Sequence, residues 1–172
     1  MAARKPTRLE MGFLLLFYAA LSGSLIVAYL SGDEDTYTMH MVAGYTALIT
    51  LGLRFGAGLL APAGSPLRWP RPSRVAVRDW VRRIVAGDGT ALRGRSPLLP
   101  WFAVIMLATA GAAAVSGWLA DGMRVFEGLH GAIGEAVPLV VAGHVGTVLG
   151  LHLLRKYGPS PAAPALQSTG NR

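Results

Sequence analysis

The chain has 172 residues, of which 52% are hydrophobic, and a formal net charge of +7 at pH 7. Such an apolar composition is unusual for a soluble globular domain, and the length suits one small membrane domain. Because the chain contains no cysteine, its composition excludes disulfides, iron–sulfur clusters held by thiolates and covalently attached c-type haem.

Four apolar segments follow in chain order, at residues 11–30, 39–60, 98–119 and 129–154. Each is close to the roughly 20 residues that a helix needs to cross a bilayer, and none shows the alternation of a barrel strand. The first segment has a basic start, but it is longer than the apolar core of a signal peptide, so we expect it to remain as a helix. The predicted fold class is an all-α membrane protein.

The connections between these segments predict their arrangement. Short turns at residues 32–35 and 120–123 join the first pair and the last pair of segments. Neighbouring helices should therefore run antiparallel in an up-down-up-down four-helix transmembrane bundle. Residues 1–157 would form this domain, and residues 158–172 are predicted to be a disordered cytoplasmic tail.

Charge predicts the orientation in the membrane. Every lysine and arginine except Arg124 lies on the side that holds the two chain ends and the long connection at residues 61–97. Basic residues accumulate on the cytoplasmic side, so both termini are expected there. The opposite turns are acidic, with Asp33, Glu34, Asp35, Asp121 and Glu127. The basic excess thus indicates topology and contact with anionic lipid, and no nucleic-acid partner is expected.

Within the long connection, residues 73–86 interleave arginines with apolar residues such as Val77, Trp80 and Ile84 at helical spacing. This pattern predicts a short amphipathic helix in the headgroup region of the bilayer. An ordinary polar loop with one helical turn is the alternative.

All four histidines of the chain, His40, His130, His144 and His152, lie in apolar segments. Ionisable residues inside a membrane are usually functional. His40 and His130 each begin a segment on the outer side, so they would lie at one depth and could ligate one haem iron. Ligation by two imidazoles closes both axial sites, which is typical of an electron carrier. The alternative is two unrelated polar residues at helix starts.

Small residues near these histidines would make room for a flat macrocycle. Gly44 and Gly134 each lie four residues after a histidine, one helical turn away on the same face. The third apolar segment has no histidine but carries a face of small residues, for which packing against other helices is favoured over contact with a cofactor. This face comprises Ala108, Gly111, Ala112, Ala113, Ala114, Ser116 and Gly117.

Two segments resemble those of a known family, the bacterial cytochrome b561 proteins and the related cytochrome b subunits of membrane-bound hydrogenases. One reads His-Met-Val-Ala-Gly from His40, with Arg54 fourteen residues after the histidine; the other reads Leu-His-Gly-Ala around His130, with His144 fourteen residues later. The similarity covers nearly the whole chain in topology, but its specific motifs occupy only these two segments. It implies two stacked b haems, with His40 and His130 on the outer one and His144 on the inner one.

The chain departs from this family in its first segment. The family normally has a histidine there that partners the inner iron, whereas residues 1–39 contain none. Met11 is the nearest candidate for a replacement ligand, and a thioether would raise the reduction potential. A five-coordinate inner haem, an absent inner haem and an unidentified ligand remain as alternatives.

Two further residues each have two alternative roles. Arg54 could pair with a haem propionate or extend toward the headgroups at the end of its segment. His152 could hydrogen-bond a propionate or accept a proton at a quinol site, or it could also extend toward the headgroups.

The resemblance implies a cytochrome of the bacterial inner membrane that relays electrons between membrane quinone and an outer partner. The acidic outer turns would suit a basic soluble c-type cytochrome. A superoxide-to-quinone oxidoreductase is a second redox reading. The membrane-anchor subunit of a larger dehydrogenase or hydrogenase is a third reading, and a haem-free scaffold or transporter is a fourth.

Overall fold

The computed structural model describes residues 5–92 and 94–157, and the predicted tail at residues 158–172 lies outside them. The described residues form helices and no strand. The α-helices are α1 (Arg8–Leu30), α2 (Tyr37–Leu60), α3 (Arg74–Val85), α4 (Leu99–Gly122) and α5 (Glu127–Tyr157). Three short 3-10 helices join them: η1 (Glu34–Thr36), η2 (Gly89–Leu92) and η3 (Arg124–Phe126). The all-α prediction is confirmed.

Four of the helices, α1, α2, α4 and α5, are long and apolar enough to cross a membrane, as predicted. Their large apolar side chains point outward: Leu16 is 71% exposed and Leu139 is 73% exposed. The residues buried between helices are mostly small, and they include Ala43, Ala47 and Ala113. Large residues outside and small residues between helices are the reverse of a soluble core, and they suit helices surrounded by lipid.

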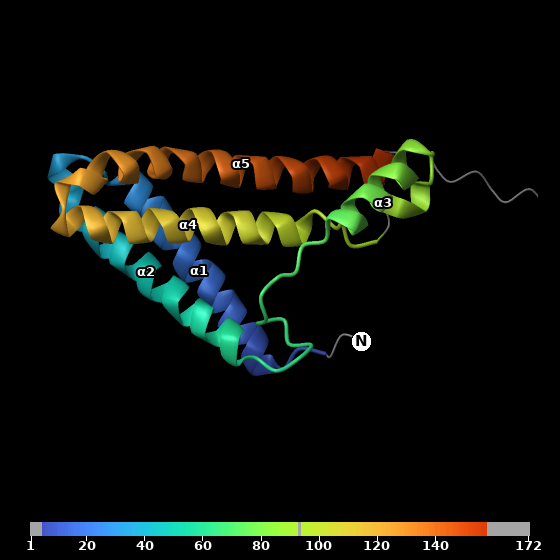
Figure 1. The fold of residues 1–172 in the computed structure, drawn as a ribbon, viewed down its shortest axis with the longest axis horizontal. Coiled ribbons are helices and arrows are strands. Elements are labelled where there is room, and N and C mark those ends of the chain that lie inside the picture. The colour runs from blue at the N-terminus through green and yellow to red at the C-terminus, as the bar shows by residue number, and fades with distance from the viewer. Residues whose placement is uncertain (1–4, 93, 158–172) are drawn as a thin grey trace, which may run out of the picture.

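The four long helices form two hairpins. Figure 1 shows α1 beside α2 and α4 beside α5, and the two hairpins pack on each other through α2 and α4. They meet at the end that holds residues 31–36 and 123–126, which we call the turn end. They diverge toward the other end, called here the basic end, where α1 begins and α5 finishes (Figure 1). The hairpins thus touch at one end only, a feature that the predicted up-down-up-down bundle did not specify.

The first half of the long connection is fixed to the α1/α2 hairpin. Thr7 caps α1 in a reciprocal pair of hydrogen bonds with Glu10, and the Ser65 hydroxyl donates to Glu10 Oε1 at 2.6 Å. The Arg54 side chain is buried, and its Nη1 donates to the carbonyl oxygen of Leu67 at 2.7 Å. Its guanidinium lies 5.8 Å from the ring centres of both Phe17 and Trp69.

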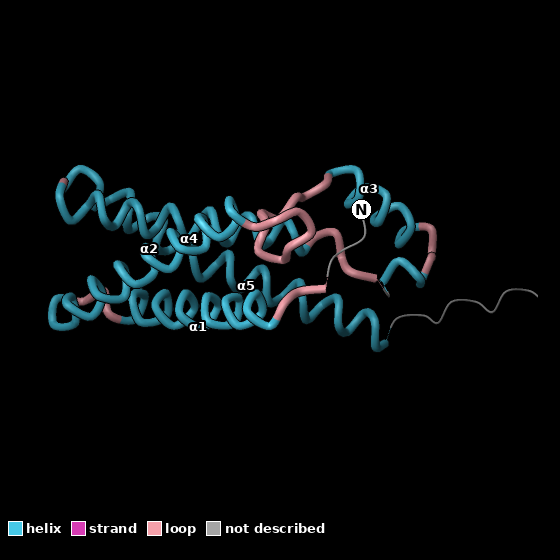
Figure 2. The backbone as a smooth tube through the Cα atoms, turned by 90° about the horizontal axis from the view of Figure 1, so that it is seen from below, coloured by secondary structure: helices cyan, strands magenta, loops and turns pink. Residues whose placement is uncertain are grey.

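The second half of the connection holds α3 and is fixed to α5. The longer loops before and after α3 lie at the basic end (Figure 2). Ser73 caps the first turn of α3 by accepting from the Ala76 amide at 3.2 Å. Trp80 Nε1 donates to the Ala91 carbonyl oxygen at 3.0 Å, and Arg155 Nη2 donates to the Gly94 carbonyl oxygen at 2.8 Å. The helix predicted within residues 73–86 is therefore present.

Candidate functional site

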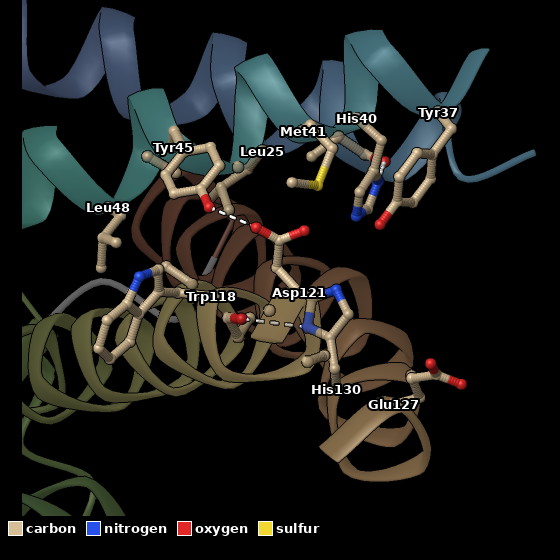
Figure 3. A pocket seen from close by; sticks show the side chains of 18 residues that line it. Leu25, Tyr37, His40, Met41, Tyr45, Leu48, Trp118, Asp121, Glu127 and His130 are labelled. Atoms are coloured by element: carbon tan, nitrogen blue, oxygen red, sulfur yellow. Dashed lines mark hydrogen bonds between the residues drawn. The ribbon is translucent and has the colours of Figure 1, made fainter. Parts of the chain in front are cut away.

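His40 and His130 lie opposite each other where the two hairpins meet. His40 is in the first turn of α2 and His130 is in the first turn of α5. Their ring centroids are 5.8 Å apart and the ring planes differ by 72°. Figure 3 shows the two rings pointing toward one another from opposite hairpins. The structure therefore brings together the two residues that the sequence assigned to one iron.

Each ring is held by a backbone carbonyl of the neighbouring helix in its own hairpin. His40 Nδ1 is 2.7 Å from the carbonyl oxygen of Ala28 in α1. His130 Nδ1 is 3.1 Å from the carbonyl oxygen of Ala113 in α4 and 3.3 Å from Ser116 Oγ. A carbonyl oxygen can only accept, so Nδ1 carries a proton in both rings, and in the neutral imidazole Nε2 then holds the lone pair that could bind a metal. Metal-ligating histidines are oriented by this kind of bond.

The His130 ring can pack against α4 because Gly117 has no side chain. A Cβ atom built on Gly117 would lie 2.9 Å from Cε1 and 3.2 Å from Nδ1 of His130. Real Cβ atoms are almost never so close to a ring atom, so the ring can pack there only against a glycine. The sequence indicated a small-residue face that includes Gly117, but it gave no sign of this contact.

A pocket of about 350 Å³ lies between the hairpins beside the two histidines. Small residues line it from both sides, among them Gly44, Ala47, Ala114 and Gly131. Its larger lining residues include Met41, Tyr45, Leu48, Trp118 and Asp121 (Figure 3). A Cβ atom on Gly44 would meet nothing within 4 Å. Gly44 therefore leaves open space beside the pocket, whereas Gly134 is not among the residues that line this pocket.

One hydrogen bond joins the hairpins across this pocket. The Tyr45 hydroxyl in α2 donates to Asp121 Oδ2 in α4 at 2.8 Å (Figure 3). The sequence placed Asp121 among the acidic residues of an outer turn and did not single out Tyr45. Because the two residues are far apart in the chain, no local pattern indicates their contact.

The donor set of this site fits haem. With metal–nitrogen bonds of about 2.0–2.1 Å, two imidazoles on opposite sides of one metal have ring centroids roughly 6 Å apart, close to the 5.8 Å found here. Residues 5–92 and 94–157 contain no group of three or more His, Cys, Asp or Glu side chains that could hold a metal ion. Haem iron needs only two protein ligands, because the porphyrin supplies the others.

The structure does not complete a second site at His144. The His144 ring lies edge-on to Phe102 of α4 at 5.4 Å, and its Nδ1 is buried without a hydrogen-bond partner among residues 5–92 and 94–157. Met11 is 43% exposed near the start of α1, and Figure 1 shows this end of α1 apart from α5. The structure therefore does not bring Met11 and His144 together.

Arg54 and His152 also lie outside the paired-histidine site. Arg54 is 5% exposed, so it does not extend to solvent as a headgroup-seeking arginine would, and it fixes residues 61–70 through Leu67 and Trp69. Its Nε has no hydrogen-bond partner in the described part of the chain. His152 is exposed on α5 near the basic end, which suits either of its two readings.

No protein-family model, curated protein or solved structure matches this chain.

Proposed function

We propose that this chain is an integral membrane haem b protein that carries electrons, with His40 and His130 as the two axial ligands. The observation that supports this proposal is the opposed pair of imidazoles, each with Nδ1 bonded to a carbonyl oxygen, which leaves Nε2 as the ligating nitrogen. A haem bound there would supply a one-electron couple, and two protein ligands would leave no axial position for oxygen.

The residues of the site would act by binding and orienting. Ala28 and Ala113 fix the tautomer of the two histidines through their carbonyl oxygens, which makes each Nε2 a better ligand. Gly44, Ala47 and Ala114 leave room beside the rings. The larger apolar side chains that line the pocket, among them Met41, Leu48 and Trp118, would keep water away from the metal.

We further propose a stoichiometry of one haem per chain. His144 is near the aromatic ring of Phe102, and the start of α1, where the related family has its inner ligand, lies apart from α5 (Figure 1). A single haem near the turn end would confine electron exchange to that side of the membrane. Quinol would then have to reach the same region as the outer partner.

The proposed orientation places the basic end in the cytoplasm of a bacterial cell and the turn end outside. Basic side chains at one end of membrane-crossing helices support this orientation. The turn end exposes acidic side chains for a basic soluble c-type cytochrome, namely Asp33, Glu34, Asp35, Asp121 and Glu127.

The experiment is a pyridine haemochrome assay with protein quantification on the purified chain. One haem b per chain is expected, and His40→Ala or His130→Ala should each remove it. His144→Ala and His152→Ala are matched controls that should keep it. A folded, colourless preparation from haem-replete cells would overturn the function, whereas two haems per chain would overturn only the stoichiometry.

A further inference from the structure

The α3 helix occupies a place where membrane contact is expected. It lies in the connection between α2 and α4, both of which are long and apolar enough to cross a bilayer, and Figure 1 places it at the basic end. Bonds from Trp80 to Ala91 and from Arg155 to Gly94 fix this region to α5. Its exposed side is therefore a defined surface.

One side of α3 combines arginines with exposed valines. Because an α-helix turns about 100° per residue, Arg74, Arg78 and Arg82 follow one another along a single stripe. Val85 lies within this stripe and Val81 lies at its edge, and the two are 82% and 44% exposed. We call these five residues the α3 surface.

The side of α3 next to Val81 is used within the protein. Val77, Trp80 and Ile84 are half-buried, and α3 packs against η2. The apolar residues of α3 thus divide into an inward set and an exposed set. Internal packing explains the first set only, so the exposed valines of the α3 surface need another environment.

The positive charge of the α3 surface is largely uncompensated in the part of the chain that the structure describes. Arg83, outside the surface, donates to Asp88 at 2.8 Å. Arg78 approaches Asp79 at 3.9 Å with both side chains more than half exposed, and such pairs contribute little. Arg74 and Arg82 have no carboxylate partner among the described residues.

We propose that the α3 surface binds the headgroups of anionic lipids, with Arg74, Arg78 and Arg82 at the phosphates and Val81 and Val85 at the acyl boundary. Guanidinium groups bind phosphate oxygens through several donors, and amphipathic helices of this kind lie in the membrane interface. A soluble polyanion would leave the valines in water. A lipid surface covers both kinds of side chain, and the flanking helices already place α3 beside it.

The test uses the full chain in nanodiscs, and the lack of native cysteine allows a single spin label. Val85→Cys carries the label on the α3 surface, and Ala76→Cys carries it about 180° away on the same helix. Accessibility to oxygen and to a water-soluble nickel complex is measured in phosphatidylcholine alone and with added phosphatidylglycerol. The label at position 85 should gain oxygen access and lose nickel access with phosphatidylglycerol, whereas the label at position 76 should stay accessible to nickel.

Charge variants then test the arginines. Each basic side chain near an anionic surface contributes about 1 kcal/mol, so the combined Arg74→Gln, Arg78→Gln and Arg82→Gln should lower the insertion equilibrium by about a hundredfold. The matched control is Arg68→Gln, Arg71→Gln and Arg95→Gln, which removes the same charge from the same connection. If both triple variants lost the change in accessibility that phosphatidylglycerol causes at position 85, the assignment to the α3 surface would be overturned. A label at position 85 that stays equally accessible to nickel in both lipids would overturn the proposal, even where a triple variant fails to fold.

Discussion

The ring of His40 and the ring of His130 face each other with centroids 5.8 Å apart, and each is anchored within its own hairpin. Ala28 of α1 anchors His40, and Ala113 of α4 anchors His130. The α1/α2 hairpin thus carries one histidine and the carbonyl oxygen that orients it, and the α4/α5 hairpin carries the other histidine and its carbonyl oxygen. Binding of one haem would join the hairpins at the end where they already touch.

Gly117→Ala should weaken haem binding without preventing folding. The added Cβ would lie 2.9 Å from Cε1 of His130, so the ring must move away from the Ala113 carbonyl oxygen. Overpacking of this kind costs about 1–3 kcal/mol, which corresponds to a roughly 5- to 150-fold loss of affinity. Haem titration of the haem-free protein, followed by Soret absorbance, measures the change.

Gly111→Ala is the control for this prediction, because a Cβ atom on Gly111 of the same helix would meet nothing within 4 Å. It should bind haem as the unaltered chain does. Equal affinities for Gly117→Ala and the unaltered chain would show that the His130 ring does not need this contact.

Tyr45→Phe should loosen the contact between the hairpins and leave haem ligation intact. The variant loses the hydrogen bond to Asp121 across the pocket, and because the pair is exposed at the rim, the loss of stability should be small. Thermal unfolding of Tyr45→Phe, Asp121→Asn and the double variant measures the coupling. Strictly additive effects of the two changes would show that this hydrogen bond does not contribute.

The pairing of the two histidines could be predicted because both were expected at the same depth. His40 and His130 each start an apolar segment on the same side, and the length of a membrane-crossing helix fixes the level of its first turn. The presence of α3 could be predicted too, since Val77, Trp80 and Ile84 recur at helical spacing. In both cases the signal is local and periodic.

The supporting contacts could not be predicted, because they depend on how each helix is rotated about its axis. The sequence does not specify the helix rotation that places the Ala28 carbonyl oxygen or Gly117 beside a histidine. The burial of Arg54 depends on residues 61–70 folding back onto the α1/α2 hairpin through Leu67. A long irregular connection has no period from which such a return could be inferred. For the same reason the divergence of the hairpins at the basic end was not expected.

Arg54→Gln should destabilise the α1/α2 hairpin while the haem content stays at one per chain. The Arg54 guanidinium donates to Leu67 and lies between Phe17 and Trp69, so its loss removes a buried charged hydrogen bond worth about 1–3 kcal/mol. Thermal unfolding followed by circular dichroism measures the effect. Arg68→Gln, which changes an exposed arginine, should have almost no effect. Loss of haem in Arg54→Gln would instead support contact with a propionate.

The ionised carboxylate of Asp88 should hold the end of α3 in place throughout the neutral pH range. Hydrogen bonds from Thr90 and Arg83 lower the pKa of the Asp88 carboxyl to about 2. Because the folded pKa lies below that of the unfolded chain, the stabilisation is complete above about pH 4 and is lost as the pH falls through about 2.

Asp88→Asn removes the charge at neutral pH and should speed amide hydrogen exchange in residues 83–92, measured by mass spectrometry at pH 7. Asp79→Asn, which alters only the 3.9 Å contact with Arg78, should leave the exchange unchanged. Equal exchange rates in the two variants would mean that the Asp88 carboxylate does not hold this turn.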